Sequence, residues 1–189
     1  PRYFEALLRG RDAAEAPEIT ARICGICPVA YIMSASAAVE RAWGVRVTPE
    51  IAALRRLIYC GEWIQSHVLH AALLHAPDFL GLPDAVHIAQ ARPELVRDAL
   101  RLKKLGNAVM EVVGGRAVHP VNARIGGFFR APAPDRVRAL LPELEWGAEA
   151  ARRMALAFAA FDFPAFEADY LFVSLGGGDA YPILGERIV

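Results

Sequence analysis

The chain has 189 residues, equal numbers of basic and acidic residues, and hydrophobic residues at 55% of its positions. A chain of this length and composition can bury its own hydrophobic core, which excludes a disordered protein. The sequence has no basic stripe and no apolar run long enough for a membrane span. It therefore excludes a typical nucleic-acid-binding surface and a membrane-spanning helix.

The chain begins with segments that are predicted to be helical. Residues 1–10 place apolar side chains on one helical face, and Glu5 and Arg9 have the spacing of an i,i+4 ion pair. On spacing alone, Glu5 is a solvated carboxylate that pairs with Arg9. A short helical piece is expected within residues 13–20, and it leads into an unusual turn.

That turn holds two of the three cysteines in the chain. Cys24 and Cys27 are separated by Gly25 and Ile26, so both sulfur atoms can point at one metal atom. Gly25 has no Cβ and allows a tight turn, and Pro28 fixes the backbone just after the second thiol. The odd cysteine count and the close pair fit a reducing compartment rather than a structural disulfide. The pattern indicates a metal or redox site.

Further helices are predicted after the turn. Thr48, Pro49 and Glu50 form a strong helix start, with a capping side chain, a proline at the first helical position and an acid in the first turn. Gly44 is a natural C-cap for the helix before it. The apolar spacing predicts helices over residues 31–44, 49–75, 84–91, 93–113 and 136–161, with an early break in the last one at Pro142.

The long helix over residues 49–75 carries a cysteine and a group of histidines. His67 and His70 share one helical face, and His75 follows five residues later. Helical histidine pairs can bind metals, but this stretch has no acidic partner at metal-site spacing. We therefore expect packed or hydrogen-bonded histidines. Cys60 is expected to be a small buried hydrophobic residue.

A second unusual stretch covers residues 114–130. Paired glycines and alternating β-branched residues predict a short hairpin or an irregular β excursion. Two interpretations of its polar side chains stay open: they line a pocket, or they satisfy loop carbonyls. These side chains are Arg116, His119, Asn122 and Arg124. A further strand is predicted over residues 171–175. The expected fold is one mainly α domain over residues 1–189, with minor β excursions around 114–130 and near 170–175.

Three kinds of site compete for Cys24 and Cys27. A thioredoxin-like dithiol needs a preceding β-strand, whereas residues 1–50 have helical patterns. A structural zinc site needs a second ligand pair, and His67 and His70 would have to fold back toward the turn. The third is a soft transition metal held by thiolates, with its remaining ligands outside this chain.

The sequence Arg-Ile-Cys-Gly-Ile-Cys-Pro-Val-Ala over residues 22–30 resembles the N-terminal cysteine signature of nickel–iron hydrogenase large subunits. The resemblance covers nearly the whole chain, and it is strongest in residues 1–5, 10–12, 62–70, 77–79, 114–116, 119–120 and 126–127. Thr20 and Ala21 before the signature, and Pro-Val-Ala-Tyr after Cys27, look most like the soluble cytoplasmic class. That class couples hydrogen to NAD(P) and includes the sulfhydrogenases.

The resemblance implies roles for individual residues. Cys24 matches the terminal nickel thiolate, and Cys27 matches the thiolate that bridges nickel and iron. Glu5 falls where the family places a carboxylate ligand to a magnesium ion, which prefers oxygen ligands. At Tyr31 many relatives carry a histidine, and a phenol hydroxyl can still donate a hydrogen bond there.

The resemblance also implies an activity, cofactors and partners. The family splits H2 heterolytically at a nickel–iron centre whose iron carries carbon monoxide and cyanide. Electrons then pass to iron–sulfur clusters in a small partner protein and, in this class, to a flavin-containing diaphorase and NAD(P). The location implied is cytoplasmic.

The family completes its centre with a second cysteine pair near the C-terminus, and the chain has no such pair. We therefore expect an N-terminal fragment that supplies half of the thiolates and is inactive alone. Two alternatives stay open. One is a non-catalytic subunit like those of the respiratory complex family, although such relatives commonly lack both cysteines. The other is a structural zinc domain.

Overall fold

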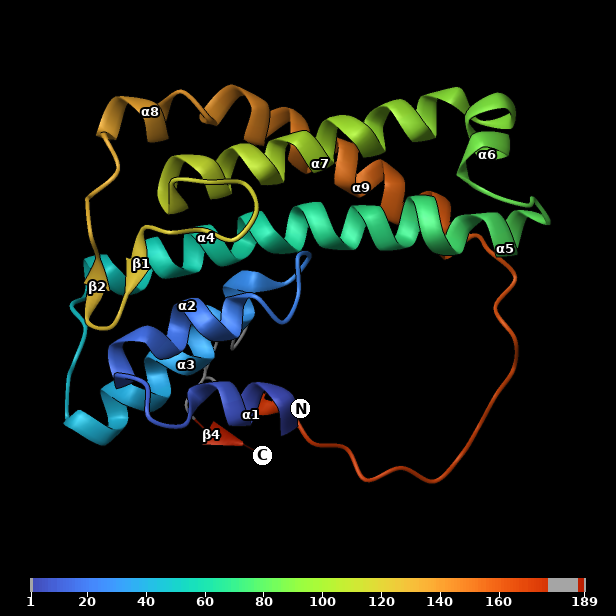
Figure 1. The fold of residues 1–189 in the computed structure, drawn as a ribbon. Helices are drawn as coiled ribbons and strands as arrows, with labels where there is room; N and C mark the ends of the chain where they lie inside the picture. Colours follow the sequence, from blue (N-terminus) through green and yellow to red (C-terminus); the bar gives the residue numbers. More distant parts are fainter. Residues whose placement is uncertain (1, 177–186, 189) are drawn as a thin grey trace.

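The computed structural model describes residues 2–176 and 187–188, and they form a mainly helical structure (Figure 1). Two long helices run side by side in opposite directions at its centre. The first is α4 (Pro49–Val68), which starts where Thr48 accepts a hydrogen bond from the N–H of Ile51. The second is α7 (Pro93–Gly114). The expected mainly α fold is confirmed.

The predicted helix over residues 49–75 is continuous but changes type along its length. After α4 the chain enters a π-helical segment, η2 (Leu69–His75), and then α5 (Ala76–Leu80). Gly81 ends this run in the left-handed conformation, with φ of 64°. The short helix predicted over residues 84–91 is α6 (Ala85–Ala91), and Asp84 caps its start.

A smaller group of helices precedes α4. It consists of α1 (Arg2–Leu8), the 3₁₀ turn η1 (Ala13–Glu15), α2 (Ala16–Ala21) and α3 (Pro28–Trp43). The third helix begins at Pro28, three residues before the predicted start, because proline is well suited to the first helical position. It ends at Gly44, whose φ of 69° confirms the predicted C-cap.

Glycines allow α4 and α7 to approach closely. A Cβ added to Gly106 would lie 2.5 Å from the carbonyl oxygen of Gly61 and 2.6 Å from the backbone nitrogen of Gln65. A Cβ on Gly61 would lie 2.9 Å from Val109. The two backbones are therefore in direct contact, and any side chain at Gly106 would push them apart.

The buried residues form two clusters along this helix pair. One joins α2 and α3 to α4 and α7, and its members are Ala21, Val29, Ile32, Met33, Ile58, Met110 and Val113. The other lies where α4, η2, α7 and α9 (Leu141–Ala159) meet, and its members are Val68, Ala72, Ala99, Leu102, Leu105, Ala150 and Met154. The first cluster lies directly under the cysteine-containing connection between α2 and α3, because Ala21 and Val29 flank that connection.

A short hairpin is anchored to this first cluster. Strands β1 (Ala123–Arg124) and β2 (Gly127–Phe128) pair antiparallel, which confirms the predicted β excursion. Arg55 donates two hydrogen bonds to the buried carboxylate of Glu40, at 2.9 and 2.5 Å, and a third to the carbonyl of Arg124. The N–H of Gly126 also donates to Glu40. One buried ion pair thus joins α3, α4 and the hairpin.

Two of the four polar side chains of this region contact the loop itself. The amide of Asn122 donates to the carbonyls of Val113 and Arg130, both at 2.8 Å, and accepts from the N–H of Arg130. The guanidinium of Arg124 lies over the ring of Phe129. For Asn122 the interpretation as a residue that satisfies loop carbonyls is confirmed.

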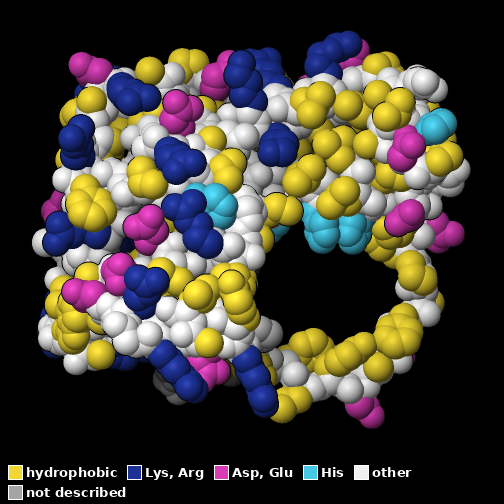
Figure 2. Space-filling model, in the orientation of Figure 1, with side chains coloured by type: hydrophobic (Ala, Val, Ile, Leu, Met, Phe, Trp, Pro, Cys, Tyr) yellow, Lys and Arg dark blue, Asp and Glu magenta, His cyan; other side chains and the backbone are white. Residues whose placement is uncertain are grey.

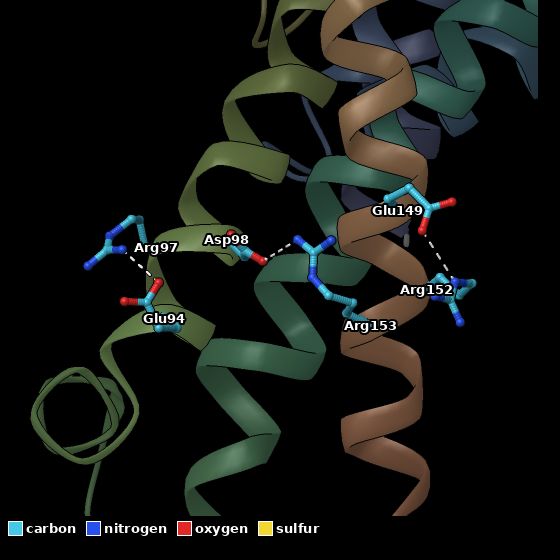
Figure 3. A network of polar contacts seen from close by, with 6 residues as sticks. All are labelled: Glu94, Arg97, Asp98, Glu149, Arg152 and Arg153. Carbon is cyan, nitrogen blue, oxygen red and sulfur yellow. Dashed lines mark hydrogen bonds and ion pairs between the residues drawn. The ribbon is translucent and has the colours of Figure 1, made fainter.

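The predicted helix over residues 136–161 is divided into two helices. These are α8 (Pro134–Arg138) and α9, so the break comes just before Pro142, as predicted. Figure 3 shows Arg153 of α9 reaching across to Asp98 of α7, with a separation of 2.9 Å. The other pairs in Figure 3, Glu94–Arg97 and Glu149–Arg152, each lie within one helix. Such exposed pairs contribute only up to about 1 kcal/mol each.

The prediction of a strand over residues 171–175 is wrong for residues 171–174. Residues 162–174 form no regular element and run away from the helices, with many apolar side chains exposed (Figures 1 and 2). Pairing begins only at β3 (Leu175–Gly176), opposite β4 (Arg187–Ile188). A β-prone segment needs a neighbouring strand, and none of the described residues supplies one to residues 171–174. None of the described helices is long and apolar enough to cross a membrane.

Candidate metal centre

Cys24 and Cys27 lie together in the connection between α2 and α3. The N–H of Cys27 donates to the sulfur of Cys24 at 3.3 Å. Neither thiol forms a disulfide, and both are partly exposed. The residues between them, Gly25 and Ile26, are exposed. The predicted tight turn is therefore present, and both of its cysteines are partly accessible.

The two thiols differ in acidity. Burial raises the pKa of Cys24, but hydrogen bonds from the thiol and backbone of Cys27 and from the N–H of Ile26 outweigh it, so the pKa is lowered overall. Burial raises the pKa of Cys27 to about 11, helped by its hydrogen bond to Cys24 and by the negative charges of Cys24 and Glu62. Of the two thiols, Cys24 is therefore the more acidic and Cys27 holds its proton more tightly.

Two side chains of α4 contact the backbone on either side of the second cysteine. The carboxylate of Glu62 accepts hydrogen bonds from the N–H groups of Val29 and Ala30, at 2.5 and 3.2 Å. The amide of Gln65 donates to the carbonyl of Ile26 at 2.8 Å. Burial raises the pKa of Glu62 to about 7, although the two N–H donors oppose this shift. Sequence reasoning did not single out either residue. The available signal was two polar residues three positions apart on a largely apolar helix face.

The other candidate residues lie as follows. Glu5 is exposed on α1, where its carboxylate pairs with Arg9 at 3.5 Å, as the spacing predicts. Its role as a magnesium ligand stays a prediction. Tyr31 is half-buried in the first turns of α3, and its carbonyl accepts from the hydroxyl of Thr20 at 3.5 Å. Among residues 2–176 and 187–188, no group of three or more His, Cys, Asp or Glu side chains converges as a metal site.

The histidines of η2 and its flanks are packed or hydrogen-bonded, as expected. The Nε2 atoms of His70 and His75 lie 3.1 Å apart. The ring of His67 packs on Trp63, with centroids 5.4 Å apart. Cys60 is partly buried on α4 and forms no disulfide. A structural zinc site would require histidines to converge with the cysteine pair. No such convergence is found among the described residues.

Comparison with known proteins gives a consistent result. The family described as nickel-dependent hydrogenase matches residues 2–131. The alpha subunit of sulfhydrogenase 2 from Pyrococcus furiosus is 37% identical over 190 residues, covering 100% of this chain and 46% of that protein. The alpha subunit of sulfhydrogenase 1 from the same organism is 35% identical over 198 residues, covering 100% of this chain and 44% of that protein.

Solved structures share the fold. The crystal structure of an NAD+-reducing [NiFe]-hydrogenase in the H2-reduced state superposes with a TM-score of 0.74 and 33% identity, covering 82% of this chain and 37% of that one. The chain thus spans less than half the length of the relatives it matches. The match to the family includes the cysteine turn and both long central helices. The chain therefore belongs to the nickel-dependent hydrogenase family.

Proposed function

We propose that this chain is part of the large subunit of a nickel–iron hydrogenase that catalyses the reversible heterolytic cleavage of H2. The observation that carries the proposal is the adjacency of two unpaired thiols, Cys24 and Cys27, in a segment that the family match includes. Relatives with this segment are named as hydrogenase subunits, and they are about twice the length of this chain.

The chemistry of the turn fits a nickel–iron centre. Thiolates are soft donors that suit nickel, and a sulfur atom can bridge two metals. Both thiols are partly exposed, so ligands from elsewhere in the full protein can reach the same metals. Within this proposal Cys24 would hold nickel as a terminal ligand, and Cys27 would be a ligand to both nickel and iron. Glu5 is proposed as a ligand to a nearby magnesium ion.

The residues of the turn have definite tasks in this mechanism. When bound, the nickel–iron centre, whose iron carries carbon monoxide and cyanide, supplies the redox-active Lewis acids at which H2 is split. The N–H of Cys27 orients the sulfur of Cys24 through a hydrogen bond. Metal binding must displace the thiol proton of Cys27, because the pKa of that group is about 11 in the metal-free turn. Assembly of the site therefore releases protons and is favoured by higher pH.

The electron acceptors are proposed from the relatives. A small iron–sulfur subunit receives the electrons, and a flavin-containing diaphorase passes them to NAD(P), in the cytoplasm. The similarity to the NAD+-reducing [NiFe]-hydrogenase supports this acceptor.

The test uses the full-length protein purified with its partner subunits. We expect stoichiometric nickel and H2-dependent reduction of NAD+ or NADP+. Cys24→Ser and Cys27→Ser should each lower nickel content and abolish activity, whereas Cys60→Ser should leave both unchanged. Stoichiometric zinc in place of nickel would contradict the proposal, and so would nickel content that does not change in Cys24→Ser and Cys27→Ser.

A further inference from the structure

The strongest unassigned feature is the way α4 holds the backbone around Cys27. Glu62 and Gln65 lie three residues apart on one face of α4, and their exposed fractions are only 2% and 5%. Glu62 binds the first turn of α3, and Gln65 binds the carbonyl of Ile26. The two residues therefore fix the chain just before and just after the second cysteine.

The helix start at Cys27 explains why the carboxylate is needed there. Cys27 is the N-cap residue of α3, Pro28 is the first helical residue, and the N–H groups of Val29 and Ala30 follow. An N-cap Ser, Thr, Asp or Asn would satisfy one of these N–H groups with its own side chain. Cys27 makes no such hydrogen bond, and Glu62 accepts from both N–H groups instead. The sulfur of Cys27 therefore makes no capping hydrogen bond to the N–H groups of α3.

The orientation of Gln65 is set from a third helix. The ammonium group of Lys103 on α7 lies 3.4 Å from the side-chain oxygen of Gln65. A lysine can only donate, so this contact turns the amide nitrogen of Gln65 toward the carbonyl of Ile26. Gly106, one turn further along α7, keeps the two helices close enough for this contact. The support for the turn is therefore built into the α4–α7 packing.

We propose that Glu62 and Gln65 are positioning residues that hold the sulfur of Cys27 in place to bridge two metals, with Glu62 capping α3 on behalf of that cysteine. This inference rests on the proposed nickel–iron site. Both carboxylate oxygens of Glu62 are used as acceptors. A glutamine at this position has one acceptor oxygen and would turn its NH2 group toward a backbone N–H. Glu62→Gln therefore removes one acceptor for the N–H groups of α3 while the size of the side chain stays nearly the same.

The first experiment measures the cap without metal. Amide hydrogen exchange is followed in the metal-free full-length subunit for peptides covering residues 24–31. At pH 8, where Glu62 with its pKa of about 7 is ionised, Glu62→Gln should speed exchange there by roughly 10- to 100-fold, the range expected when hydrogen bonds to a charged group are lost. Glu94→Gln, on the exposed surface of α7, is the matched control and should change nothing. Unchanged exchange over residues 24–31 in Glu62→Gln would overturn the inference.

The second experiment measures the metal site in the assembled enzyme, through nickel content, infrared bands of the diatomic iron ligands and steady-state kinetics. Glu62→Gln should shift the bands and lower kcat about tenfold, as expected for loss of support to a metal ligand. Gln65→Leu removes the Ile26 contact without changing charge, and it should also shift the bands; it serves as the test if Glu62→Gln does not accumulate. A wild-type enzyme without nickel would refute the proposed function. A nickel-containing wild-type enzyme whose bands are identical in both variants would refute this inference alone.

Discussion

The close approach of α4 and α7 gives a prediction whose size follows from the structure. In Gly106→Ala the new methyl group would lie 2.5 Å from the carbonyl oxygen of Gly61, roughly 0.7 Å inside an ordinary carbon–oxygen contact of about 3.2 Å. The atoms it meets are backbone, so the helices must separate. Overpacking of this kind costs about 1–3 kcal/mol, and the better helix propensity of alanine returns up to about 1 kcal/mol. We expect a net loss of about 1–2 kcal/mol.

Thermal unfolding of the full-length subunit, followed by circular dichroism, checks this value. For a subunit of about twice this chain's length, an unfolding entropy of about 2.1 cal/mol/K per residue gives a shift of roughly 1 °C per kcal/mol, so the midpoint should fall by about 1–2 °C. Gly147→Ala is the matched control, because the added methyl group would meet side-chain ends and no backbone: the Cδ2 atoms of Leu105 at 2.6 Å and of Leu102 at 3.5 Å. It should be neutral or slightly stabilising. The packing argument is wrong if Gly106→Ala unfolds at the same temperature as Gly147→Ala.

Three further predictions concern buried or reactive charges. Arg55→Met leaves the carboxylate of Glu40 buried without its partner and should cost about 3–5 kcal/mol, measured by denaturant unfolding; a loss under 1 kcal/mol would contradict the role of this pair. The pKa of Glu62 is raised to about 7 from 4.5, so its contribution to stability is complete below pH 4.5 and is lost as the pH rises through 7. The loss is about 3 kcal/mol, so the unfolding midpoint of the wild-type protein should fall over this pH range. Glu62→Gln should remove this pH dependence, and an equal pH dependence in both proteins would refute the raised pKa of Glu62. In metal-free protein at pH 8, Cys24 should be alkylated faster than Cys27, because its pKa is lowered while that of Cys27 is about 11; peptide mass spectrometry gives the order, and the reverse order would contradict it.

Much of the helical framework could be predicted because its signals are local. Thr48 with Pro49 marks the start of α4, and Gly44 marks the end of α3, since capping and left-handed glycine depend on adjacent residues. The close approach of Cys24 and Cys27 could also be predicted, because only two residues separate them in the sequence. These features need no knowledge of what packs against them.

The remaining features depend on contacts between distant segments. Glu62 supports the cysteine turn only because α4 lies across the start of α3, 33 residues away in sequence. Nothing in the spacing of the long helix predicts its π-helical segment over η2. Residues 171–174 have strand-like side chains but no strand partner among the described residues. For the cysteine turn and for residues 171–174, the presence or absence of a partner segment decides the structure.

The central claim is that Cys24 and Cys27 hold half of a nickel–iron centre. The most direct test is a crystal structure of the full-length protein with anomalous data collected at the nickel and iron absorption edges. Our account predicts a nickel peak within bonding distance of both sulfur atoms and an iron peak within bonding distance of Cys27 only. A zinc peak at this turn, or the absence of any metal peak between the two sulfur atoms, would contradict it.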